Sequence, residues 1–141
     1  MKPKTVKILY WTVTGLFSLF LLMAGITEAM QHESGRQIMQ HLGYPVHVML
    51  VIGIGKILAA LALIQTRYRV IKEWAYAGVT FNLIGAFAAR ANAGDSTGLI
   101  LSPLIFLSVM FLSYFLWKKV AKATAAPLHP EPQEVKFLKI A

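Results

Sequence analysis

Residues 46–64 read VHVMLVIGIGKILAALALI, an apolar run that is interrupted near its centre by Lys56. Nineteen residues in an α-helix extend about 28 Å, close to the roughly 30 Å thickness of a bilayer core. A lysine near the bilayer midplane costs about 3 kcal/mol on insertion scales. The run therefore predicts a membrane helix whose lysine needs a polar partner from a neighbouring helix.

The composition of the chain fits this prediction. Hydrophobic residues make up 57% of the 141 residues and charged residues 14%, whereas soluble domains carry about 25% charged residues. Apolar runs recur at about 8–30, 74–90 and 98–117. We expect an all-α integral membrane protein, an antiparallel four-helix bundle over residues 1–122, in which a polar link joins the first two helices. The proline-rich segment 123–141 is expected to be a disordered cytoplasmic tail.

Lysine and arginine residues are distributed unequally between the ends of the expected helices. Positive charge gathers on the cytoplasmic side of bacterial membrane proteins, which places both termini in the cytoplasm. The net charge of +8 is therefore expected to serve contacts with anionic lipid headgroups rather than binding of nucleic acid. Two basic residues flank the helices on one side, Arg36 and Arg90, and nine on the other: Lys2, Lys4, Lys7, Arg67, Arg69, Lys72, Lys118, Lys119 and Lys122.

The first apolar run also has the basic start of a secretory signal peptide. Its length exceeds the 7–15 apolar residues of a signal peptide, however, which favours a retained helix. The expected location is therefore the bacterial cytoplasmic membrane, with the lipid bilayer as the surrounding partner.

Polar residues on the expected helices form a candidate intramembrane cluster of Glu28, Lys56, Asn82 and Arg90. Glu28 is the best-placed acceptor for Lys56, and Asn82 is a second one, because all three share stripes with small residues that favour close helix packing. Two interpretations stay open. The cluster is either a polar lock that fixes the helix order, or the lining of an outward-opening cavity that holds an anionic or quinone-like ligand.

Methionine and histidine alternate around the expected first loop. Thioether and imidazole groups are ligands that suit copper, but no spacing here defines a closed site, and we predict no metal centre. The absence of cysteine excludes thiolate ligands and disulfides. The copper candidates considered are Met30, His32, Met39, His41, His47 and Met49.

Four segments together resemble the DoxX-like family of small four-helix membrane proteins. They are MAGITEAM at 23–30, GIGKILAALALI at 53–64, KEWAYAGVTFNLIGAFAA at 72–89 and GD at 94–95. Family members often carry histidine where this chain has Arg90, so a proton-transfer role does not carry over to that position. The resemblance implies a four-helix bundle and carries over the family-pattern positions Gly25, Lys56, Glu73, Gly78, Gly85 and Asp95.

Distant relatives in this family include a subunit of thiosulfate:quinone oxidoreductase. The resemblance thus implies an accessory or small-ligand-binding subunit linked to quinone or sulfur redox chemistry, without catalytic activity of its own. Quinone is the implied cofactor, and a membrane redox protein or a second copy of the chain is the implied partner. The alternatives are a structural or assembly factor without a ligand, and a small four-helix exporter. The position of Glu28 near a membrane edge and the one-sided basic residues argue against an exporter.

Overall fold

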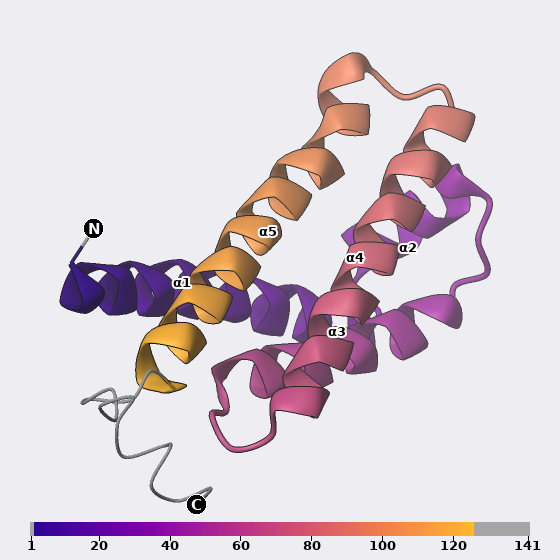
Figure 1. The fold of residues 1–141 in the computed structure, drawn as a ribbon. Coiled ribbons are helices and arrows are strands. Elements are labelled where there is room, and N and C mark those ends of the chain that lie inside the picture. Colours follow the sequence, from indigo (N-terminus) through magenta and orange to yellow (C-terminus); the bar gives the residue numbers. More distant parts are fainter. Residues whose placement is uncertain (1, 126–141) are drawn as a thin grey trace, which may run out of the picture.

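The computed structural model describes residues 2–125, which are all-α. Its helices are α1 (Pro3–Ala29), α2 (Glu33–Leu42), α3 (Val48–Ile64), α4 (Arg69–Asn92) and α5 (Thr97–Ala125). The longer helices contact one another in the order α1, α3, α4, α5 and back to α1, while the short α2 packs on α3 and α4. Figure 1 shows α4 and α5 side by side, with α1 crossing α5.

The described part has five helices, so the expectation of four is corrected by the presence of α2. The polar link at 30–44 contains this additional helix. His32 accepts a hydrogen bond from the Ser34 N–H at the start of the helix, as an N-cap residue does. Gly43, with φ of +80°, follows its last turn, and glycine adopts this left-handed conformation readily.

The four expected apolar helices are present with different bounds. The helix expected at 46–64 begins at Val48, after a turn in which Pro45 accepts a hydrogen bond from the Val48 N–H. The helices expected at 74–90 and 98–117 extend further, to the bounds of α4 and α5. Their polar ends continue the helix after the apolar run has stopped. Residues 123–125 belong to α5, and the rest of the expected tail lies outside the described residues.

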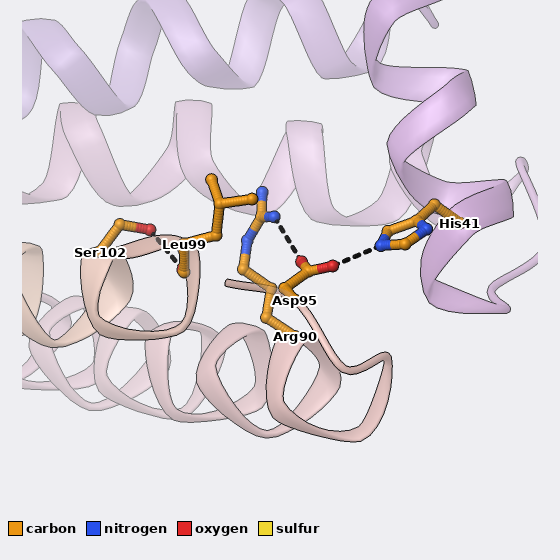
Figure 2. Close-up of polar contacts among 5 residues, drawn as sticks. All are labelled: His41, Arg90, Asp95, Leu99 and Ser102. Atoms are coloured by element: carbon orange, nitrogen blue, oxygen red, sulfur yellow. Dashed lines mark hydrogen bonds and ion pairs between the residues drawn. The ribbon is translucent and has the colours of Figure 1, made fainter. Parts of the chain in front are cut away.

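Helix α5 contains a proline at position 103. Proline has no N–H, so the carbonyl of Leu99, four residues earlier, loses its usual helical partner. The Ser102 hydroxyl donates a hydrogen bond to this carbonyl at 2.8 Å (Figure 2). A side chain thus replaces the missing backbone bond in α5.

Two of the helices, α1 and α5, are long and apolar enough to cross a membrane by length and composition, and α3 is a shorter apolar helix. Large apolar side chains cover the outside of the molecule, including Leu16, Ile105 and Phe115, each more than 60% exposed. Continuous apolar surface of this kind is unusual on soluble monomers. Helices α1 and α5 are therefore candidate membrane helices.

The interior combines apolar side chains with a small hydrogen-bonded group. The Ser113 hydroxyl of α5 lies 2.6 Å from Thr14 Oγ1 of α1 and 2.8 Å from Tyr76 Oη of α4. Thr14 and Ser113 are fully buried, and buried hydroxyls are costly unless they bond to one another. This group joins α1, α4 and α5 at one level of the structure.

Candidate functional site

Lys56 of α3 is paired with Glu28 of α1. Its Nζ donates a hydrogen bond to Glu28 Oε1 at 2.6 Å, and each side chain is about one-fifth exposed. The second carboxylate oxygen, Oε2, is buried without a hydrogen-bond partner among the described residues. The structure therefore confirms the expected contact, which offsets the cost of a charged lysine in the middle of an apolar helix.

A backbone contact one turn earlier on each helix makes this pair possible. A Cβ added at Gly25 would lie 2.8 Å from the Gly53 carbonyl oxygen, and a Cβ added at Gly53 would lie 2.5 Å from the Ala29 nitrogen. Neither position has room for a side chain. Because residues three apart share a helix face, the same close crossing brings Glu28 and Lys56 together.

The pair lines a cavity of about 470 Å³, here called the central cavity, to which all five helices contribute. The four residues of the candidate cluster, Glu28, Lys56, Asn82 and Arg90, all line it. Helix α2 closes one side with its apolar residues Ile38, Met39 and Leu42. The remaining lining is mostly apolar and includes Phe17, Leu21, Met49, Ile52, Phe81, Leu83, Pro103 and Phe106.

A second hollow, here called the lateral groove, lies between α3 and α4 and has a volume of about 400 Å³. Small residues such as Gly55 and Gly78 leave this space open, since a Cβ added at either would meet nothing within 4 Å. Lys56 and Asn82 line both the lateral groove and the central cavity. They are therefore the polar residues that the two hollows share.

Asn82 remains without a partner in the described part of the chain, where its carboxamide makes no hydrogen bond. Asn82 was expected as a second acceptor for Lys56, but the hydrogen bond that Lys56 makes there is to Glu28. A carboxamide carries two N–H donors and one carbonyl acceptor. Its donors and acceptor thus remain free for a ligand or for water.

Arg90 lines the central cavity but is held by a different residue. Its Nη1 donates to Asp95 Oδ2 at 2.9 Å. The other oxygen of Asp95 bonds His41 Nε2 at the end of α2 (Figure 2). The hydrogen bond from His41, followed by that from Arg90, lowers the pKa of Asp95 below its ordinary value of 3.8. The ionised Asp95 thus joins α2 to the connection between α4 and α5.

The family-pattern positions do not gather at one place. Gly25 forms the close crossing with α3, and Asp95 holds Arg90 and His41. Gly85 lines the central cavity and Gly78 the lateral groove. Glu73 lies near the other end of α4, where it accepts a hydrogen bond from Lys118 of α5.

The histidines and methionines considered for copper have separate surroundings. His32 caps α2, and His41 bonds Asp95. Met49 is buried beside Gly35, where its Cε occupies the space that a side chain would need. Among residues 2–125, no group of three histidine or acidic side chains is arranged to hold a metal ion.

Sequence reasoning missed the role of Lys72, which was counted only as a basic residue flanking a helix. The side chain is buried, and its Nζ donates to the Tyr10 hydroxyl at 2.7 Å. The sequence signal for this role was the position of Lys72 four residues before Tyr76, on the same face of a helix. Its neighbours there include the aromatic residues predicted at the membrane edge.

Comparison with known proteins identifies the family. The model of the DoxX-like family matches residues 12–113. The chain belongs to the DoxX-like family. The matched range contains Glu28, Lys56, Asn82 and Arg90, so the central cavity lies within the family domain. No curated protein and no solved structure matched this DoxX-like chain.

Proposed function

We propose that this DoxX-like protein is an accessory membrane subunit that binds a small quinone-like molecule in its central cavity. The observation that carries the proposal is the combination of the Glu28–Lys56 pair and a free Asn82 carboxamide in a mostly apolar lining. Ligand sites typically have this character, a mostly apolar wall with few polar groups that fix the orientation.

The chemistry of a quinone suits the two hollows. A quinone head carries carbonyl acceptors, for which the Lys56 ammonium and the Asn82 amide are donors. Its apolar tail would lie in the lateral groove, since Lys56 and Asn82 line both spaces. The chain has no cysteine, so thiol chemistry on a sulfur substrate is assigned to a membrane redox partner. The protein itself holds and orients the ligand.

We further propose that α1, α3, α4 and α5 span the bacterial cytoplasmic membrane, with both termini in the cytoplasm. The short α2 then lies at the outer surface and covers the central cavity. The proposal rests on the basic residues at the N-terminus, in the connection between α3 and α4 and at the end of α5, together with the positive-inside rule.

Cysteine labelling tests this orientation, and the natural chain contributes no background because it lacks cysteine. A membrane-impermeant maleimide is expected to label a Gln40→Cys variant in intact cells. It should label an Arg67→Cys variant only after the membrane has been permeabilised. The reverse pattern, or labelling of both variants in intact cells, would contradict the proposed orientation.

Native mass spectrometry of the protein released from mild detergent tests the bound ligand. We expect a retained quinone on the natural protein and at least a tenfold lower occupancy on an Asn82→Leu variant, since the similarly shaped leucine cannot hydrogen-bond the ligand. Asn92→Leu is the matched control, because Asn92 is exposed at the end of α4. Absence of a ligand from the natural protein, or equal occupancy in both variants, would contradict the proposal.

A structural factor without a ligand is the second candidate function. The close crossing at Gly25 and Gly53 favours it, because a salt bridge beside such a crossing also fixes the register of two helices. The exporter alternative has less support, since the Glu28 carboxylate is engaged by Lys56.

A further inference from the structure

Lys72 is a buried lysine without a carboxylate partner in the described part of the chain. The residue is 3% exposed. Its Nζ donates one hydrogen bond, to the Tyr10 hydroxyl, and lies 5.4 Å from the ring centres of both Tyr10 and Trp117. Aromatic faces attract a cation, but an ammonium group has three donors. The Lys72 ammonium group therefore has two further N–H donors and a positive charge that no carboxylate neutralises among the described residues. An anion would satisfy both.

A cavity of about 510 Å³ lies beside this lysine, and we name it the basic cavity. Three basic side chains line it: Lys7 from α1, and Arg69 and Lys72 from the first turn of α4. The connection between α3 and α4 closes another side, where Gln65 bonds the backbone N–H and carbonyl of Tyr68 and shapes the turn. No aspartate or glutamate lines the cavity within the described residues.

The surroundings of the basic cavity have the properties of a membrane interface. Trp11 and Tyr68 line it and are partly exposed, at 37% and 52%. Amphipathic aromatic residues are enriched at the level of the lipid headgroups. Trp117 and Val120 provide an apolar wall, along which an acyl chain can leave toward the apolar outside of α1 and α5. A free inorganic anion has no apolar part that could pack against Trp117 and Val120.

We propose that the basic cavity binds the phosphate headgroup of an anionic phospholipid. The phosphate would bond Arg69 and Lys72, with Lys7 at the rim, and the acyl chains would stay in the bilayer. A zwitterionic lipid fits less well, because the cavity would place the positive charge of its headgroup among three cations. This site lies apart from the central cavity and does not depend on the function proposed for that cavity.

Lipid binding to the full-length protein tests this proposal by native mass spectrometry and by thermal unfolding in detergent. Phosphatidylglycerol is expected to bind and to raise the melting temperature, whereas phosphatidylcholine and inorganic phosphate are not. An Arg69→Gln/Lys72→Gln variant should bind phosphatidylglycerol roughly thirtyfold more weakly. Because Lys72→Gln changes a buried residue and is expected to lower stability, a second variant, Lys7→Gln/Arg69→Gln, changes two exposed residues only and should also bind more weakly.

The matched control removes two charges at the same end of the molecule, outside the basic cavity. Arg67 and Lys119 are exposed and do not line it, so an Arg67→Gln/Lys119→Gln variant should keep its affinity. Equal weakening in the control would assign the effect to general surface charge and overturn the proposal. Stabilisation by inorganic phosphate to the same extent as by phosphatidylglycerol would also overturn it, in favour of a free-anion site.

Discussion

A Gly53→Ala substitution is expected to destabilise the protein by about 1–3 kcal/mol, the usual cost of an overpacked interior. The new Cβ would lie 2.5 Å from the Ala29 nitrogen and 2.7 Å from the Gly25 carbonyl oxygen. Both atoms belong to the backbone of α1, so relief requires the two helices to separate. That separation would also lengthen the contact between Glu28 and Lys56. Thermal unfolding in detergent measures the loss.

The matched control for this substitution is Gly55→Ala in the same helix. A Cβ at Gly55 would meet nothing within 4 Å, and alanine is the better helix former. The stability of this variant is therefore expected to be unchanged or slightly higher. If both variants lose the same stability, or if Gly53→Ala loses none, the close crossing of α1 and α3 is not an essential contact.

Single substitutions of the Glu28–Lys56 pair are expected to cost more than replacing both residues. Either Lys56→Met or Glu28→Leu leaves the remaining partner without its hydrogen bond. Breaking a buried pair costs about 3–5 kcal/mol, whereas replacement of both partners by hydrophobic residues of similar volume is often neutral. Because each side chain is about one-fifth exposed, we expect about 2 kcal/mol for each single variant and near-natural stability for the double variant.

A double-mutant cycle measures this coupling, because additive losses would mean that the two residues act independently. The Lys118–Glu73 pair is the internal control. Its side chains are about 40% exposed, and exposed pairs typically contribute less than about 1 kcal/mol. Additive losses at Glu28 and Lys56, or equal coupling energies at both pairs, would contradict the expectation that the Glu28–Lys56 pair contributes more to stability than an exposed pair.

The pairing of Glu28 with Lys56 could be predicted from the sequence because a lysine in an apolar helix has few possible partners. Glycine and alanine stripes on both helices indicated which faces meet. The sequence did not show how closely they meet. The contact between Gly25 and Gly53 depends on where the two helices cross, which is a property of the packed structure.

Helix α2 was missed for a different physical reason. A membrane helix is recognised by a continuous run of apolar residues, whereas the α2 segment is polar on one side. Its signals are local: His32 as N-cap, apolar residues at Ile38, Met39 and Leu42, and Gly43 after the last turn. These apolar residues line the central cavity. Their packing partners lie on other helices, so the segment alone could not show that it covers a cavity.

The surroundings of the remaining charged residues depended on tertiary contacts. Arg90 was expected in one cluster with Lys56 and lines the same cavity, but the sequence did not show that Asp95 holds its guanidinium group. Lys72 lies in a helix that starts earlier than the apolar run suggested, so its side chain turns inward to Tyr10 instead of outward.

We propose that the Glu28–Lys56 pair and its cavity hold a ligand, in addition to holding the helices together. Equilibrium binding of a short-chain ubiquinone to the Glu28→Leu/Lys56→Met double variant tests this proposal. We predict that this variant unfolds at nearly the same temperature as the natural protein and binds the quinone at least tenfold more weakly, the effect of about 1.4 kcal/mol. Equal affinity in the stable double variant, or no binding to the natural protein, would contradict the claim and leave the pair a purely structural contact.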